Sequence, residues 1–357
     1  MFPPIGLSLF SFGYLGGFAR REHERVSPGP VLSVEQLISL TRVHGLRGIE
    51  LPLARCFPGL PEDSLAQLKE RVTAAGLFLS IDAEVVDEDW LPETLTVASK
   101  FGESFIRAKL SKTLGGNRYL TGLDHETWFA QTLQRLKHVA PLARDHGMII
   151  AIENHQDVTS AELLRLIGEV GDDVLGVNLD TGSTLATCED PVEFASAVAP
   201  YIRNVHLKDY RLVCGPQGFR LVRCALGCGV VDVAKIFAIL RERAPVGVRA
   251  SIELGAVVAR EVHWLTPTYW CAFPPRTVTA LTSFLQLLLA RLEEDGMSWR
   301  TPWERGASAD QCEGIELDEV FRSVAFLQSL GAPIRHGLPR ALTSLAELAS
   351  VETVAVP

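Results

Sequence analysis

The sequence predicts an α/β fold, a closed (β/α)8 barrel followed by a C-terminal helical extension. Short apolar runs alternate with amphipathic stretches, and this pattern repeats about eight times in roughly 250 residues. No GxGxxG turn follows the first apolar run, which disfavours a doubly wound sheet. Charged residues stand at the ends of several runs, which is where the active site of such a barrel lies.

The predicted strands are short apolar runs that a barrel would bury on both faces. In chain order they are expected at 5–10, 47–51, 77–84, 104–110, 148–153, 175–180, 202–209 and 250–254. Between them, apolar residues recur every three to four positions, which predicts helices over 34–44, 61–76, 91–101, 124–146, 160–171, 191–199 and 233–243. Ser33 and Asp232 are expected to cap two of these helices. The segments 13–30 and 210–227 are expected to be loops because they are rich in glycine.

We expect the barrel to occupy residues 1–255 and the extension to occupy residues 256–357. An aromatic stretch at 263–276 is predicted to cover the mouth of the barrel or to contact another subunit. Helical patterns at 278–292, 317–330 and 338–351 are expected to pack on the barrel wall or on a partner. The extension therefore allows a homo-oligomer, and without a low-complexity linker the chain is expected to form one elaborated domain.

Composition limits the class of partner. The chain has 34 basic and 43 acidic residues and a net charge of −9, which disfavours nucleic acid and suits a small-molecule partner. Seven scattered cysteines favour free thiols in a reducing compartment over a disulfide framework. No apolar run reaches the roughly 18 residues that span a bilayer, and the N-terminus lacks the features of a signal peptide. We therefore expect a cytoplasmic protein without a membrane partner.

Four predicted strands end in residues that bind hard or borderline metal ions. The segment MIIAIENHQD brings Glu153 to a strand end, and later runs bring Asp180, His206 and Glu253 to theirs. Three carboxylates and one imidazole suit a divalent cation, and three carboxylates held close together would repel one another without one. Mn²⁺ is our first expectation, with Mg²⁺ and Co²⁺ as alternatives.

The motifs IENH, VNLDTG, VHLKD and IEL, in this order, resemble the xylose isomerase-like TIM-barrel superfamily, in particular the sugar phosphate isomerase/epimerase group with its ketose 3-epimerases. The resemblance extends from about Gly6 to Gly255. It implies that Glu153, Asp180, His206 and Glu253 bind the metal. It also implies that Glu153 and Glu253 are the catalytic acid/base pair, with His155 and Lys208 in contact with the substrate.

The expected function is therefore that of a divalent-metal-dependent isomerase or epimerase, which acts on a ketose or related sugar through an enediolate. Ser183 is a departure, because many epimerases have a substrate-binding histidine three residues after the metal aspartate. Some relatives instead resemble lyases, which decarboxylate 3-oxo sugar acids or cleave C-glycosides. Arg107, Lys109 or Arg276 would then pair with a substrate carboxylate.

Other interpretations remain open for individual residues and for the whole chain. The alternative role for Arg107 and Lys109 is to neutralise acids inside the barrel. Glu50 is expected either to line the pocket or to support the barrel floor. Asp209 is expected to orient Lys208 or His206. Cys224 and Cys228 are too few for a zinc knuckle. A non-catalytic sugar-binding module is the alternative to an enzyme, whereas an abasic-site endonuclease would require more histidine ligands and a basic face.

Overall fold

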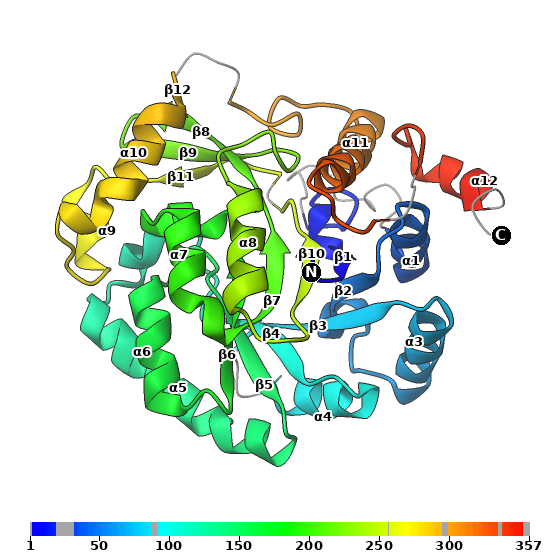
Figure 1. Cartoon of the computed structure of the whole chain (residues 1–357), viewed down its shortest axis with the longest axis horizontal. Helices are drawn as coiled ribbons and strands as arrows, with labels where there is room; N and C mark the ends of the chain where they lie inside the picture. The colour runs from blue at the N-terminus through cyan, green and yellow to red at the C-terminus, as the bar shows by residue number, and fades with distance from the viewer. Residues whose placement is uncertain are drawn as a thin grey trace.

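The computed structural model describes residues 2–18, 32–86, 91–255, 257–294, 299–334 and 338–352. At its centre is a closed barrel in the order β1-β10-β7-β6-β5-β4-β3-β2, with all neighbours parallel (Figure 1). The strands are β1 (Ile5–Ser8), β2 (Gly48–Pro52), β3 (Phe78–Val85), β4 (Phe105–Lys109), β5 (Ile149–Glu153), β6 (Leu175–Asp180), β7 (Ile202–Leu207) and β10 (Arg249–Ile252). The predicted barrel is thereby confirmed.

The strands are mostly apolar, because helices cover the outside of the barrel while side chains fill its interior, but buried polar residues such as Asp82, Arg107 and Asn204 interrupt several of them. The strand register aligns residues near the carboxyl ends of neighbouring strands. In this register Lys109 of β4 lies opposite Glu153 of β5, and Asp180 of β6 lies opposite His206 of β7. Polar side chains from separate parts of the sequence therefore meet at one end of the barrel.

Seven helices of the outer layer lie where the sequence predicts them (Figure 1). They are α1 (Val34–Val43), α3 (Glu62–Ala74), α4 (Leu91–Phe101), α5 (His125–Asp145), α6 (Ser160–Val170), α7 (Pro191–Val198) and α8 (Val233–Arg243). Ser33 caps α1 by accepting a hydrogen bond from Gln36 N, and Asp232 caps α8 by accepting one from Lys235 N. Shorter elements are α2 (Leu53–Cys56), η1 (Leu9–Ser11), η2 (Asn117–Thr121), η3 (Ser183–Thr187) and η4 (Ala199–Tyr201).

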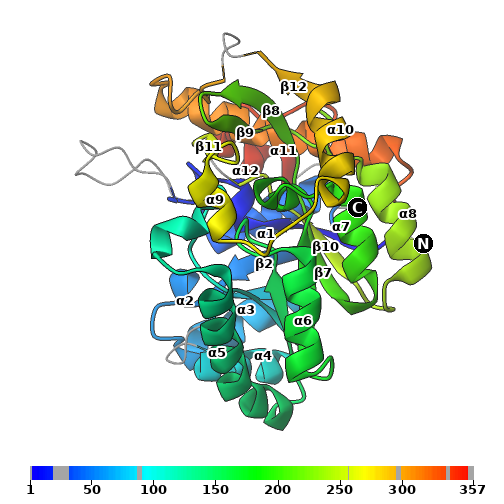
Figure 2. The ribbon, with the colours of Figure 1, turned by 90° about the vertical axis from the view of Figure 1, so that its left-hand side faces the viewer.

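A second sheet, which the sequence did not predict, lies beyond one end of the barrel (Figure 2). Its order is β11-β9-β8-β12, formed by β8 (Tyr210–Gly215), β9 (Gly218–Arg223), β11 (Arg260–Val262) and β12 (Leu292–Glu293). The expected loop after Asp209 is therefore wrong, because β8 and β9 form a tight antiparallel hairpin across Pro216 and Gln217. The sheet therefore combines β8 and β9, which precede residue 255, with β11 and β12, which follow it.

The second sheet has a hydrophobic core of its own. Tyr269 and Phe273 from the aromatic stretch pack with Phe219 of β9 and Phe284 in this cluster. The aromatic stretch contains α9 (Pro267–Cys271), and the next apolar segment forms η5 (Thr279–Leu281) and α10 (Thr282–Arg291). We call β8, β9, β11, β12, α9 and α10 the cap.

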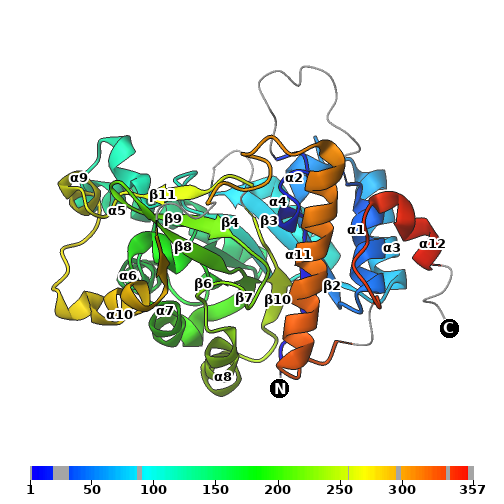
Figure 3. The ribbon, with the colours of Figure 1, turned by 90° about the horizontal axis from the view of Figure 1, so that it is seen from above.

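After the cap the chain returns to the barrel as α11 (Ala309–Ser329), which begins eight residues earlier than predicted. Figures 1 and 3 show α11 beside α1, next to β1 and β10. Its residues Leu317, Val320, Val324 and Leu327 are part of the barrel's hydrophobic core. It therefore stands in the eighth helix position of the barrel.

Only part of the last predicted helix forms. Residues 338–344 are not helical, and η6 (Leu345–Glu347) and α12 (Leu348–Glu352) follow, with α12 against α1. Most of the expected loop at 13–30 lies outside the described residues. All seven cysteines are described and each is a free thiol, as predicted. Among the described helices, none has the length and apolar character that crossing a membrane requires.

Candidate metal centre

Four strand ends bring the candidate ligands together. Glu153 ends β5, Asp180 ends β6, His206 lies one residue before the end of β7, and Glu253 follows β10 directly. One ligand atom of each side chain lies within 4.8 Å of those of the other three, and all four residues are buried. The structure thus places these residues in one cluster, although they are separated by as many as a hundred positions in the sequence.

Lys208 lies against this cluster. Its Nζ is 2.6 Å from Asp180 Oδ2 and 2.7 Å from Glu253 Oε1. Burial alone would lower the pKa of Lys208, but the charges of Asp180 and Glu253 outweigh it and raise that pKa. Burial in turn raises the pKa of Glu253, whereas His206 and Lys208 together hold it well below its usual range. The buried ammonium thus balances two of the clustered carboxylates.

Glu50 of β2 orients the imidazole of the cluster. Its Oε1 is 2.7 Å from His206 Nε2, which leaves His206 Nδ1 facing Glu253 Oε2 at 2.9 Å. Burial opposes the charge on the ring, but Glu253 and Glu50 raise the pKa of His206 to about 9. Asn204 in turn donates from Nδ2 to Glu50 Oε2 at 3.0 Å. Glu50 therefore supports a candidate ligand and does not line the cavity beside it.

Backbone groups hold Asp180 in place. Its Oδ1 accepts hydrogen bonds from the backbone amides of Gly182 and Ser183, each at 3.0 Å. The Asn154 side chain accepts from the backbone N–H of Asp180 and donates to its carbonyl oxygen. Ser183, at the position where many epimerases have a histidine, thus contributes its backbone to the candidate ligand. Its buried hydroxyl has no hydrogen-bond partner among the described residues.

Arg107 is buried on β4 between two carboxylates. It forms ion pairs with Asp82, at 2.5 Å, and with Glu153. Burial opposes its charge, but Asp82, Glu253 and Glu50 outweigh that effect and raise its pKa. These contacts fit the neutralising role for Arg107 better than substrate contact.

The cluster fits a divalent cation by its donor atoms. Glu153 Oε1 is buried without a hydrogen-bond partner in the described part of the chain. A carboxylate oxygen left in that state is costly unless a cation or a substrate group meets it. Three carboxylates and one imidazole nitrogen are donors that Mn²⁺, Mg²⁺ and Co²⁺ accept. Glu153, Asp180, His206 and Glu253 would hold the ion.

A cavity of about 260 Å³ adjoins the cluster. Its charged and titratable lining residues are Lys109, Lys112, His155, Lys208, Tyr210, Glu253 and Arg260. Burial and three nearby cations, Lys109, Arg107 and Lys208, hold the pKa of His155 well below its usual range, so its imidazole is neutral. The structure therefore places three expected substrate contacts, Lys109, His155 and Lys208, on the wall of one cavity.

Two further residues have roles that differ from the expected ones. Asp209 accepts hydrogen bonds from four backbone amides, those of Tyr210 and of residues 227, 229 and 231, and so fixes the loop that follows β9. Arg276 donates to the backbone carbonyls of Thr187 and Cys188 and thereby attaches the segment between α9 and η5 to the loop after β6. Neither residue lines the cavity beside the cluster.

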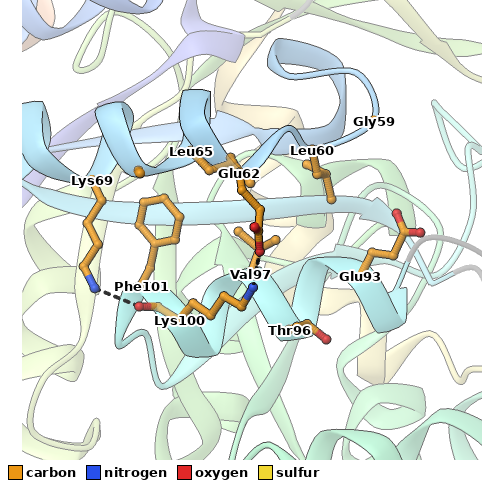
Figure 4. Close-up of a pocket in the computed structure, with 11 residues that line it drawn as sticks. Gly59, Leu60, Glu62, Leu65, Lys69, Glu93, Thr96, Val97, Lys100 and Phe101 are labelled. Carbon is orange, nitrogen blue, oxygen red and sulfur yellow. Dashed lines mark hydrogen bonds and ion pairs between the residues drawn. The ribbon is translucent and has the colours of Figure 1, made fainter.

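A second hollow, of about 500 Å³, lies on the outer wall between α3 and α4 (Figure 4). Its floor includes Leu65, Val97 and Phe101, and an ion pair of 2.8 Å joins Glu62 to Lys100 across it. It shares no lining residue with the cavity beside the candidate ligands. It is therefore a surface groove separate from the candidate metal centre.

Sequence reasoning missed Asp82, Lys112 and Arg260. Asp82 lies in the predicted strand LFLSIDAE, where an acid within an apolar run was an available signal. Arg260 follows the last barrel strand by several residues, and only the pairing of β11 with β9 positions it over the barrel. No local pattern would have indicated that placement.

Several known proteins are similar to this chain. A 3-oxo-isoapionate decarboxylase of Pectobacterium atrosepticum is 24% identical over 239 residues, which cover 66% of this chain and 80% of that protein. A xylose isomerase-like TIM barrel protein from Mycobacterium smegmatis, solved in complex with magnesium, has a TM-score of 0.52 at 18% identity and covers 81% of this chain and 97% of its own. A D-psicose 3-epimerase solved with D-fructose has a TM-score of 0.52 at 16% identity, and the match covers 92% of this chain and 99% of that chain.

The two structural similarities concern the fold alone, because their sequence identities are low. The family assignment rests on a sequence model described as xylose isomerase-like TIM barrel, which matches residues 38–268. That range contains all four residues of the candidate metal centre and Lys208. The chain belongs to the xylose isomerase-like TIM barrel family.

Proposed function

We propose that this chain is a divalent-metal-dependent enzyme that isomerises or epimerises a ketose or related sugar through an enediolate. The observation that carries the proposal is the placement of Glu153 and Glu253. They reach one cluster from β5 and β10, two strands that β6 and β7 separate in the barrel. Two carboxylates that approach a substrate from different sides are suited to removing a proton from carbon on one face and returning it on the other.

We assign a role in this reaction to each residue of the cluster and of the cavity wall. Asp180 and His206 fix the cluster, and Glu50 and Asn154 hold these two in orientation. A bound divalent cation, for which we propose Mn²⁺, supplies Lewis-acid stabilisation of negative charge on adjacent substrate oxygens. Glu153 or Glu253 accepts the proton from the carbon next to the carbonyl, and the other carboxylate returns it. His155 and Lys208 contact the sugar hydroxyls from the cavity wall.

Deuterium incorporation tests the proposed function. Ketoses are incubated with the protein and Mn²⁺ in D₂O, and deuterium at the carbon next to the carbonyl is measured by NMR. We expect incorporation with all carbon retained, and its loss in Glu253→Gln, which removes a ligand and a base. Glu126→Gln, an exposed site on α5, is the matched control. Normal exchange in Glu253→Gln would refute the proposed role of Glu253.

A second candidate is a lyase that decarboxylates a 3-oxo sugar acid. It is supported by the similarity to the 3-oxo-isoapionate decarboxylase, which extends over 80% of that protein. Loss of CO₂ from a 3-oxo acid generates an enolate, which is an enediolate when carbon 2 carries a hydroxyl group, so the same cluster would serve both reactions. Release of CO₂ from 3-oxo sugar acids, without exchange on neutral ketoses, would favour the lyase over the epimerase.

A further inference from the structure

The cavity beside the candidate metal centre carries an excess of positive charge. Lys109, Lys112, Lys208 and Arg260 line it, against one carboxylate, that of Glu253. Lys208 is already paired with two acids. Among the described residues, no carboxylate oxygen lies within 4.0 Å of the charged nitrogens of the other three cations, so none of the three forms an ion pair in that part of the chain.

Arg260 shows this most clearly. It begins β11 in the cap, and its Nε is buried without a hydrogen-bond partner in the described ranges. A guanidinium N–H that loses water and gains no acceptor costs free energy comparable to a lost hydrogen bond. Lys109 reaches the same cavity from β4 and lies 5.8 Å from the centre of the Phe10 ring. The barrel and the cap thus each direct a cation into one space.

We propose that Lys109, Lys112 and Arg260 form a subsite for a carboxylate group, so that the physiological substrate is a keto sugar acid. The inference rests on the proposed metal-dependent function, because it assumes that the sugar's reacting carbons lie at the cluster of Glu153 and Glu253. The acid group then lies at the far side of the same cavity. Arg260 donates its N–H groups to the carboxylate oxygens, and the two lysines add charge.

A carboxylate fits this subsite better than a phosphate. Phosphate groups in proteins are typically held by backbone amides at a helix N-terminus or in a glycine-rich loop. None of the described lining residues belongs to the first turn of an α-helix. The charged donors in this cavity are side chains, one of them a guanidinium, and no such backbone cradle accompanies them among the described lining residues. Phosphorylated ketoses serve as the contrasting case in the test.

The test measures binding by titration calorimetry to the full-length protein with saturating Mn²⁺. The probes are 5-keto-D-gluconate, D-fructose and D-fructose 6-phosphate. We expect the keto acid to bind at least about tenfold more tightly than fructose, and this preference to shrink as salt is raised. Equal affinity for the acid and for fructose would overturn the subsite. Tighter binding of the phosphate than of the acid would overturn the carboxylate assignment.

Variants locate the subsite. Arg260→Gln and Lys109→Gln should each weaken binding of the keto acid about tenfold or more while leaving that of fructose unchanged. Lys137→Gln, an exposed cation on α5 paired with Glu169, should change neither. Equal weakening of both probes would argue against the subsite. If Arg260→Gln does not fold, Lys109→Gln and the salt dependence of the unmodified protein provide the same decision.

The proposed function and the subsite fail separately. Deuterium exchange on neutral ketoses, with no preference for the acid, would retain the enediolate chemistry and overturn the subsite. Tight, Arg260-dependent binding of the keto acid without exchange or CO₂ release would retain the subsite and overturn the reaction.

Discussion

Lys208 Nζ lies 2.6 Å from Asp180 Oδ2, so a cation of the chain itself contacts a candidate metal ligand. The same ammonium contacts Glu253. Lys208→Met removes the charge that balances these acids, and a buried carboxylate without a partner is strongly destabilising. We expect the metal-free variant to lose about 3–5 kcal/mol of unfolding free energy. Its melting temperature should then rise more on addition of Mn²⁺ than that of the unmodified protein, because the ion no longer competes with the lysine.

Differential scanning fluorimetry with and without Mn²⁺ measures both effects. Lys235→Met is the control, because Lys235 pairs with Asp232 on the surface of α8. An unchanged response to Mn²⁺ in Lys208→Met would show that Lys208 and the metal do not use the same carboxylates.

The sequence was sufficient for the barrel and for the cluster of candidate ligands. Each barrel strand is a local apolar run, and parallel strands in a closed barrel present their carboxyl ends on one side. Once these two facts are combined, residues at successive strand ends must converge. No distance information is needed to place Glu153 near Glu253.

The cap was not predictable in the same way. The segment from Tyr210 to Arg223 has two β-branched and aromatic runs around GPQG, a hairpin signal that its glycines and proline obscured. The pairing of β11 and β12 with this hairpin depends on contacts between segments 40 to 80 residues apart. Such long-range pairings leave no periodic trace in one sequence. Arg260 was missed for that reason.

Glu50 provides a test of how the imidazole ligand is oriented. The Glu50→Gln variant keeps the size of the side chain but removes the charge that meets His206 Nε2 at 2.7 Å. The ring is then held less firmly with Nδ1 toward the other ligands. We expect affinity for Mn²⁺ to fall about tenfold to a hundredfold, measured by equilibrium dialysis.

The control for Glu50 is another carboxylate with an ion pair, whose side chain is 10% exposed. Glu103 precedes β4 and pairs with Arg249 at 2.5 Å, at the end of the barrel away from the candidate ligands. Glu103→Gln should reduce stability without changing affinity for Mn²⁺. Comparable losses of Mn²⁺ affinity in both variants would mean that Glu50 affects metal binding only by stabilising the fold, and not by orienting His206.

Glu316 attaches α11 to the loop after β1. Its carboxylate accepts hydrogen bonds from Tyr14 N at 2.8 Å and Leu15 N at 3.0 Å, and it lies 3.3 Å from Arg223. In Glu316→Gln one of these backbone amides faces an amide nitrogen and loses its acceptor. We expect the free energy of unfolding in urea to fall by about 1–3 kcal/mol.

The comparison variant for Glu316 is Asp318→Asn on the same helix. Asp318 forms a half-exposed pair with Arg322, so its replacement should change the free energy of unfolding by no more than about 0.5 kcal/mol. Equal effects of the two substitutions would show that the hydrogen bonds to Tyr14 and Leu15 do not stabilise the fold.

The burial of His44, at the C-terminus of α1, predicts that acid lowers the free energy of unfolding independently of the metal centre. Burial lowers the pKa of His44 from 6.5 to about 4, and its Nδ1 has no hydrogen-bond partner among the described residues. Between these two values the unfolded chain binds a proton that the folded protein excludes. The free energy of unfolding therefore rises with pH in this window. The contribution of His44 is complete above pH 6.5 and is lost as the pH falls toward 4.

Replacing His44 by Leu removes the titrating group and places an apolar side chain opposite Phe321 of α11. The free energy of unfolding of this variant should depend less steeply on pH between 6.5 and 4, as measured by urea unfolding at several pH values. Other groups also titrate there, so the quantity that matters is the difference between the two slopes. His138→Leu, at an exposed position on α5, should leave the slope unchanged. If the free energy of unfolding depended on pH in the same way in His44→Leu and in the unmodified protein, His44 would be protonated equally in the folded and unfolded states. The reason is that a group contributes to the pH dependence of unfolding only when the two states bind different numbers of protons at it.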